Sequence, residues 1–399
     1  MLQDDERKFI INTYNRNPEA NPLLVKGRGA KVWDENGREY LDFVGGLAVN
    51  ALGHCHPNVV KAATEQMDKI IHSSNLFYTE PQVKLAHFLV ENSAADKAFF
   101  CNSGAEANEA ALKLARKYSK LFVDDRRYEF ISAYGSFHGR TLATIAATGQ
   151  EKVQKGFEPL MPGFRYANFN DLESFRSQIT ANTCAVIIEP IQGEGGVHIA
   201  SKEFLQGLRT LCDENKLLLI FDEVQCGTGR TGNLFAYENY GVEPDIFTLA
   251  KALGGGFPIG AMLCKEKVAA GFSPGDHAST FGGNPVACAV ALSVLEEITR
   301  EDFLYEAASR GEYFVNGLQE LGDRFPELIK EVRGMGLIIG VELNKGGQNV
   351  QKGCLRRGLL INCIGDSVLR FLPPLNVTGR EMDVALMILE GALEEEAGK

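Results

Sequence analysis

The sequence predicts an α/β fold in which helices flank a mostly parallel sheet, followed by a smaller α+β part. Between about residues 98 and 264, short apolar runs alternate with helical patterns, which is typical of parallel strands joined by helices. The chain has 399 residues, too many for one simple core. A long helical pattern follows Asn284-Pro285, and short strands mix with helices beyond it. We therefore expect a large domain over residues 51–285, a C-terminal α+β domain over 286–399, and an N-terminal segment over 1–50.

Composition and charge limit the possible partners. The chain is 45% hydrophobic and 23% charged, with a formal net charge of −11 and no long basic cluster. This disfavours nucleic acid and anionic membranes as partners and favours a small molecule. No apolar run reaches about 18 residues, the N-terminus does not resemble a secretory signal, and the nine cysteines form no CxxC pair. We expect a cytoplasmic protein with reduced thiols and no membrane span.

The N-terminal part contains a hairpin pattern and a pair of histidines. Residues 31–42 alternate apolar and polar around Asn36-Gly37, which predicts a β-ribbon. His54 and His56, in GHCHP, have the chemistry of metal ligands, but no third ligand stands at a suitable spacing. We interpret them as loop histidines before a helix and expect no metal.

The predicted strands of the large domain are short apolar runs. They cover Lys97–Cys101, Tyr128–Ala133, Cys184–Pro190, Leu217–Val224, Asp245–Lys251 and Ala261–Lys265. One run ends in Asp222, another ends in Lys251, and ligands bind at the carboxyl ends of strands in open α/β sheets. An acid and an amine should therefore face one pocket.

Two loops could bind phosphate. Ser103, Gly104 and Ala105 open a helix, where free N–H groups attract anions, although Ser103 with Glu106 also fits an ordinary capping box. GTGRTG (Gly227–Gly232) fits a dinucleotide fingerprint and makes an oxidoreductase the alternative class. However, an acid pair precedes this motif and turn signals follow it, so we interpret it as a connector.

The lysine, the acid and the phosphate seat together point to pyridoxal 5'-phosphate. This cofactor needs a lysine to form an imine, an anion site for its phosphate, and an acid, typically Asp, beside its ring nitrogen. Lys251, residues 103–105 and Asp222 supply these three parts.

At this point the chain resembles the class III (ornithine-type) pyridoxal-phosphate aminotransferases of fold type I over nearly its full length. The motifs that carry the resemblance are GHCHP, SNLFY, NSGAEANEAALKLAR, SFHGRT, EPIQGEGG, FDEVQCGTGRTG, LAKALGGGFPIGA, STFGGNP and VLRFLPPL. The resemblance implies a seven-stranded sheet in the large domain, and an N-terminal segment that belongs to the small domain.

The family also implies roles for the cofactor residues. Lys251 would form the internal aldimine and move the proton, Asp222 would pair with the ring nitrogen, and Gln225 would bond the phenolic oxygen. Further cofactor-site residues would be Ser103, Gly104, Ala105, Phe137, His138, Glu223 and Val224. Thr280 would reach the phosphate in a neighbouring subunit, with Ser279 beside the substrate, which implies a homodimer with shared sites.

The substrate residues follow from the same resemblance. Arg140 would hold the distal carboxylate of N2-acetylornithine, and Arg370 the α-carboxylate of 2-oxoglutarate or glutamate, since guanidinium forks match carboxylates. Glu194 would neutralise Arg370 when the amine donor binds. Leu47 stands near the position where ornithine enzymes carry a tyrosine, which favours an acylated amine.

The amine donor has alternatives within the family. Ala105 departs from the threonine common in enzymes that act on acetylornithine, and 4-aminobutyrate enzymes share this alanine. Ornithine, succinylornithine and 4-aminobutyrate aminotransferases, and glutamate-semialdehyde aminomutases, therefore stay as alternatives.

Overall fold

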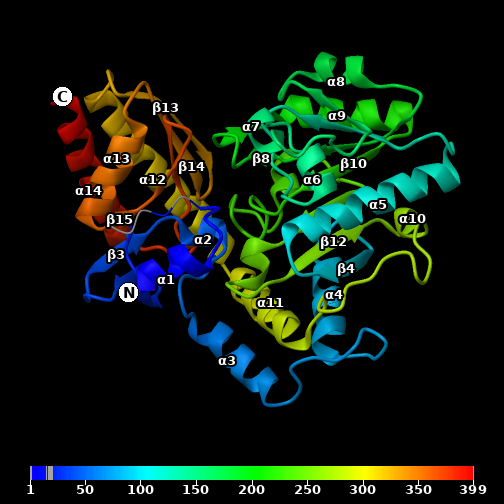
Figure 1. Cartoon of the computed structure of the whole chain (residues 1–399), viewed down its shortest axis with the longest axis horizontal. Helices are drawn as coiled ribbons and strands as arrows, with labels where there is room; N and C mark the ends of the chain where they lie inside the picture. Colours follow the sequence, from blue (N-terminus) through cyan, green and yellow to red (C-terminus); the bar gives the residue numbers. More distant parts are fainter. Residues whose placement is uncertain (1, 15, 17–20, 399) are drawn as a thin grey trace.

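The computed structural model describes residues 2–14, 16 and 21–398, and its centre is a seven-stranded sheet (Figure 1). The strand order is β4-β12-β11-β10-β7-β5-β6. Every neighbouring pair is parallel except those of β12, which runs antiparallel to β11 and β4. The predicted α/β class with a mostly parallel seven-stranded sheet is confirmed. The strands are β4 (Lys97–Cys101), β5 (Glu129–Ala133), β6 (Phe164–Ala167), β7 (Thr183–Ile188), β10 (Leu218–Asp222), β11 (Ile246–Leu249) and β12 (Gly260–Cys264).

The apolar runs form the inner strands because both faces of this sheet are covered. In β10, Leu218 and Ile220 belong to the core on one face, together with Leu114 of helix α5 (Gly104–Phe122). The alternate residues Leu219 and Phe221 belong to the core on the other face, which includes residues of helix α9 (Lys202–Asn215). Strands buried on both faces read as continuous apolar runs, which is why the sequence identified them.

The seventh strand, β6, was absent from the strands identified by pattern. It has only four residues and lies at the sheet edge, and its Arg165 is exposed. Because an edge strand is partly exposed, its sequence lacks the apolar run that marks the inner strands.

Two segments from opposite ends of the chain share a second sheet. The ribbon predicted around Asn36-Gly37 is confirmed, because β2 (Lys31–Asp34) pairs antiparallel with β3 (Glu39–Asp42). Strand β1 (Leu24–Arg28) extends the ribbon, and β15 (Leu359–Leu360) pairs parallel with β3. This pairing supports our proposal that residues 1–50 belong to the same domain as 286–399, a division that stays a prediction.

The C-terminal part contains another four-stranded sheet, in the order β13-β14-β17-β16. Its strands are β13 (Ile329–Met335), β14 (Ile338–Leu343), β16 (Asn362–Ile364) and β17 (Val368–Phe371). Its long helices are α12 (Phe303–Arg324), α13 (Gly347–Arg357) and α14 (Gly379–Ala397). Figure 1 shows this part on the left, next to both ends of the chain.

The remaining elements are mostly short. The helices that cover the large sheet or extend from it are α3 (Pro57–Met67), α4 (Glu80–Glu91), α6 (Leu142–Ala147), α7 (Glu151–Gln154), α8 (Leu172–Gln178), α10 (Glu266–Ala269) and α11 (Pro285–Ile298). The others are α1 (Leu2–Phe9), α2 (Gly45–Ala48), the 3₁₀ turns η1 (Ala236–Tyr240) and η2 (Lys251–Gly254), and the strand pair β8 (Ile191–Gln192) and β9 (His198–Ile199). Within the described ranges, no helix combines the length and apolarity needed to cross a membrane.

Candidate active site

The acid and the lysine identified in the sequence meet in one cavity of about 480 Å³. Asp222 is the last residue of β10, and Lys251 begins η2 two residues after β11. Because β10 and β11 are parallel neighbours, their carboxyl ends lie side by side. Other predicted site residues line the same cavity: Ser103, Gly104, Ala105, Phe137, His138, Arg140, Glu194, Val224 and Gln225.

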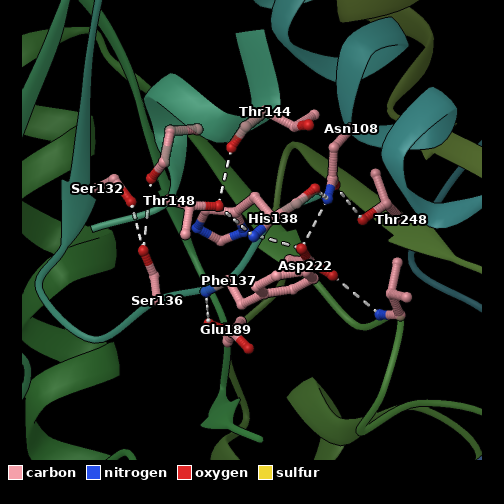
Figure 2. A network of polar contacts seen from close by, with 12 residues as sticks. Asn108, Ser132, Ser136, Phe137, His138, Thr144, Thr148, Glu189, Asp222 and Thr248 are labelled. Atoms are coloured by element: carbon pink, nitrogen blue, oxygen red, sulfur yellow. Dashed lines mark hydrogen bonds and ion pairs between the residues drawn. The ribbon is translucent and has the colours of Figure 1, made fainter. Parts of the chain in front are cut away.

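Asp222 is buried and held by three hydrogen bonds (Figure 2). Its Oδ2 accepts from Nδ2 of Asn108 at 2.7 Å and faces Nδ1 of His138 at 2.8 Å. Its Oδ1 accepts from the backbone N–H of Val224 at 3.0 Å. Asn108 is in turn fixed by Thr248, whose hydroxyl donates to Oδ1 of Asn108 at 2.8 Å. These contacts fix the orientation of the Asp222 side chain at the end of β10.

Lys251 has an unusual backbone and an unusual amine. Its φ is 44°, a left-handed conformation that is uncommon for residues with a Cβ and is found at functional sites. Burial lowers the pKa of its amine, with Arg370 acting in the same direction and Glu194, Asp222 and Glu189 opposing it. A lowered pKa favours the neutral amine, which is the nucleophilic form.

For the start of α5, the sequence left two interpretations of Ser103 open, a phosphate site and an ordinary helix cap. Oγ of Ser103 accepts from the N–H of Glu106 at 3.2 Å, and the Glu106 carboxylate accepts from the N–H of Asn102 at 2.5 Å. Ser103 therefore caps the helix, but the reciprocal bond of a capping box is absent, because Glu106 accepts from Asn102 and not from the N–H of Ser103. The same helix start lines the cavity. A Cβ on Gly104 would lie 2.7 Å from Cγ1 of Val224. Close packing against Val224 requires this glycine, whatever ligand approaches.

The buried Arg370 and the partly exposed Glu194 form an ion pair beside the cavity. Nη1 of Arg370 lies 2.7 Å from Oε1 of Glu194 and also donates to Oε1 of Gln225 at 3.1 Å and to the carbonyl of Gly193 at 2.9 Å. Nη2 of Arg370 is buried and has no hydrogen-bond partner among the described residues. The Arg370 guanidinium lowers the pKa of Glu194 against the opposing effect of burial. Arg370 itself is fully buried and is not among the residues that line the cavity, so it lies behind Glu194 and Gln225, which do line it.

Some predicted residues lie outside this cavity. Both carboxylate oxygens of Glu223 accept backbone N–H groups, from Ala236 at 2.6 Å and Tyr237 at 2.7 Å, so its side chain holds η1 and does not face the ligand. Ser279 and Thr280 line a separate hollow, and Thr280 is exposed. Leu47 is 40% exposed and is not among the lining residues.

The two histidines and the glycine-rich loop have structural surroundings. Nε2 of His54 lies 2.7 Å from Oδ2 of Asp42, and His56 precedes α3. No group of three or more His, Cys, Asp or Glu is arranged to hold a metal in the described part of the chain. GTGRTG lies between β10 and η1 and opens no α-helix, so its interpretation as a connector is confirmed.

Two site residues had no role assigned from the sequence. Asn108 lies on α5 and contacts Asp222, and a polar residue within an alanine-rich buried face was the available signal. Glu189 directly follows β7, the same strand-end signal that identified Asp222. It lines the cavity and accepts from the N–H of Phe137 at 2.9 Å. Burial raises the pKa of Glu189, and the nearby Asp222 charge raises it further.

The residues that line the cavity fit pyridoxal phosphate. Lys251 offers an amine for its aldehyde, Asp222 a fixed carboxylate for its ring nitrogen, and the helix start at Ser103 an anion site for its phosphate. Together, the fold and the site define a fold type I pyridoxal-phosphate-dependent transferase. The sequence family described as aminotransferase class III matches residues 13–393, and the chain belongs to this family.

Relatives and solved structures agree with this assignment. An acetylornithine aminotransferase of Methanocaldococcus jannaschii is 52% identical over 98% of both chains. An enzyme of the same name from Caldanaerobacter subterraneus subsp. tengcongensis is 53% identical, also over 98% of both. The N-acetylornithine aminotransferase structure from Stenotrophomonas maltophilia has a TM-score of 0.83 at 40% identity, covering 96% of this chain and 98% of that one. The ornithine aminotransferase of Toxoplasma gondii has a TM-score of 0.94 at 33% identity, covering 100% and 95%.

Proposed function

We propose that this enzyme transfers the δ-amino group of N2-acetyl-L-ornithine to 2-oxoglutarate, giving N-acetyl-L-glutamate 5-semialdehyde and L-glutamate, a step of arginine biosynthesis. The Glu194–Arg370 pair beside Lys251 carries this proposal, because it provides a carboxylate site whose charge can be switched off. The two relatives described above, which carry the name acetylornithine aminotransferase at 52% and 53% identity, support it.

The residues divide the chemistry among them. Pyridoxal phosphate, when bound, supplies an aldehyde that takes up the amino group and a ring that withdraws electrons from the substrate carbon. Asp222 holds a proton on the ring nitrogen, and His138 and Asn108 orient Asp222. Lys251 moves the proton at the carbon that bears the amine. Ser103, Gly104 and Ala105 would hold the phosphate, and Phe137 and Val224, which line the same cavity, would contact the ring.

The contacts of Gln225 add a second role to the one expected from the sequence, a bond to the cofactor's phenolic oxygen. Its Oε1 accepts from Arg370, and its Nε2 donates to Glu194 at 3.2 Å. Gln225 is therefore part of the charge switch as well as a candidate partner of the cofactor's phenolic oxygen. This dual position couples the carboxylate site to the cofactor site.

If Glu194 neutralises Arg370 in only one half-reaction, Glu194→Gln should affect the two half-reactions unequally. Without Glu194, the Arg370 charge has no acidic partner when the amine donor binds, so kcat/KM for the amine donor should fall about tenfold or more, while the KM for 2-oxoglutarate stays equal or falls. Single-turnover measurement of each half-reaction checks this. Glu331→Gln is the control, since Glu331 is an exposed acid that also pairs with an arginine, Arg333, and neither residue lines the cavity. An equal loss in both half-reactions would contradict the switch.

The choice of amine donor rests on Leu47 and Arg140. Leu47 offers no hydrogen bond to a free α-amino group, and Arg140 lies with its guanidinium 5.3 Å from the centre of the Phe137 ring, at the cavity wall. We expect kcat/KM to be highest for N2-acetylornithine when it is compared with succinylornithine, ornithine and 4-aminobutyrate, each with 2-oxoglutarate. A clear preference for free ornithine would overturn this choice.

We propose a homodimer with shared active sites. Leu76, Phe77 and Tyr78 form an exposed apolar run, in which Tyr78 is 98% exposed. Phe77 and Tyr78 also line a groove of about 930 Å³ between α3, α4 and α11, and exposed apolar surface of this kind is typical of interfaces. The exposed Thr280 suits a residue that completes a neighbour's site. Sedimentation equilibrium measures the assembly state of the protein. Cytoplasmic localisation is a separate point and stays a prediction.

A further inference from the structure

A turn with strained backbone angles directly precedes the residue that reaches the cavity. The four residues of α2, Gly45 to Ala48, all have left-handed φ values of 54°, 66°, 66° and 67°. Glycine accepts this conformation freely, whereas Leu47 and Ala48 carry a Cβ and do not. A run of this kind persists only where surrounding contacts enforce it.

Asp42 supplies the contacts that enforce the turn. Its side chain is 6% exposed, and its Oδ1 accepts the N–H groups of Val44 at 3.0 Å and Gly45 at 2.9 Å. One carboxylate oxygen therefore binds the first N–H group of the left-handed segment and the N–H group directly before it. Hydrogen bonds to a charged oxygen are stronger than neutral ones.

His54 fixes the other oxygen of Asp42. Nε2 of His54 lies 2.7 Å from Oδ2 of Asp42. The backbone of His54 is itself fixed to Gly29, with N–H to carbonyl distances of 2.8 and 2.9 Å in the two directions. A Cβ on Gly27 would lie 2.7 Å from the His54 side chain, so this glycine leaves the space that the ring occupies. The Asp42–His54 pair is thus built into the ribbon on several sides.

The turn connects this pair to both halves of the active site. Val49, which directly follows the turn, lines the cavity. On the other side, the carbonyl of Phe43 accepts the N–H of Leu372 at 2.7 Å, two residues beyond Arg370. A Cβ on Gly45 would lie 2.8 Å from the Leu372 carbonyl, so the turn has little freedom to shift.

We propose that Asp42, oriented by His54, is a positioning residue that sets the left-handed turn and thereby places Val49 in the wall of the cavity and Leu47 at its outer edge, where the amine donor enters. Asp42 touches no reacting atom and acts through the turn. The inference rests on the proposed function in one respect, that Leu47 discriminates between acylated and free ornithine. The position of Val49 in the cavity does not depend on that choice.

Asp42→Asn tests this role at nearly constant volume. In either orientation of the new amide, one carboxylate oxygen is replaced by an NH2 group, so either the turn loses its acceptor or His54 faces an amide N–H in place of a charged oxygen. We expect the ratio of kcat/KM for N2-acetylornithine to that for ornithine to fall about tenfold, mainly through KM of the acylated amine. The half-reaction with glutamate should change by less than about threefold, because glutamate is held at Arg370.

Asp34→Asn is the matched control. Asp34 is a buried aspartate of the same ribbon, and it accepts the N–H groups of Asn36 and Arg38 and the hydroxyl of Tyr40. It has the same chemistry as Asp42 but caps the hairpin turn, away from the cavity. If Asp34→Asn and Asp42→Asn lower all activities equally, Asp42 is only structural and the proposal is overturned.

A second pair of measurements keeps the test decisive if Asp42→Asn folds poorly. His54→Gln keeps the Asp42 carboxylate but removes the ring that orients it, and should shift the donor ratio in the same direction by about threefold, with faster hydrogen exchange of the amides in residues 43–50. Ala48→Gly relaxes the turn, so the effect of Asp42→Asn should be smaller in that background. Unchanged exchange and an unchanged ratio in His54→Gln would overturn the proposal.

The two hypotheses fail in different ways. If the wild-type enzyme prefers another amine, the proposed substrate is wrong, but hydrogen exchange and the comparison of wild type with variant still decide the role of Asp42. If the wild type prefers N2-acetylornithine and the Asp42→Asn ratio is unchanged, the positioning role alone is wrong.

Discussion

Lys251→Ala should lower kcat by at least about 10⁴-fold, because it removes both the attaching amine and the group that moves the proton. Lys251 lies in the cavity with Asp222, and burial lowers its pKa toward the reactive neutral form. In the wild-type enzyme, borohydride reduction and peptide mass mapping should locate the pyridoxyl group on Lys251. The variant should still take up cofactor, since the carboxylate and the helix start remain, but without covalent attachment.

Lys265→Ala serves as the control for this prediction. Lys265 follows β12 and pairs with Glu243 on the surface, with 2.6 Å between Nζ and Oε2. Its loss should leave kcat unchanged, since exposed pairs contribute little. A Lys251→Ala enzyme that keeps wild-type turnover would place the reacting amine elsewhere and contradict the site.

Asp222→Asn should lower kcat about 10²- to 10³-fold, the typical effect of removing one preorganised electrostatic contact. The amide oxygen can still accept hydrogen bonds from Asn108 and His138, while the contact with the N–H of Val224 is lost. What it lacks is the negative charge that keeps a ring nitrogen protonated. The visible spectrum of bound cofactor and the single-turnover rate with amine donor measure the two aspects separately.

Asp245→Asn separates this effect from a general loss of buried charge. Asp245 is also a buried aspartate, and its Oδ2 accepts from Arg209 at 2.8 Å and from the N–H of Leu219 at 3.0 Å. It precedes β11, at the end of the strand opposite to Lys251. This variant should lower thermal stability with little change in kcat. Equal kinetic losses in Asp222→Asn and Asp245→Asn would contradict a special role for Asp222.

The sequence determined the class of fold and the two central residues. Strands buried on both faces must be continuously apolar, so β5, β7, β10, β11 and β12 were visible as runs. Asp222 and Lys251 interrupt such runs at strand ends, where a parallel sheet gathers its ligand contacts. Edge strand β6 was not identified from the sequence, because its partly exposed residues do not have to be continuously apolar.

The tertiary structure decided which neighbouring polar residues share the site. Successive residues of an extended chain point to opposite sides, so Asp222 faces the cavity while Glu223 turns to the N–H groups of η1. Contacts over long sequence separations, such as Asn108 with Asp222 and Arg370 with Glu194, depend on how elements pack. The left-handed turn after Asp42 is likewise a tertiary result, because Leu47 and Ala48 do not favour that conformation by themselves. Local sequence patterns determined the strands and their chemistry, whereas long-range packing selected which side chains work together.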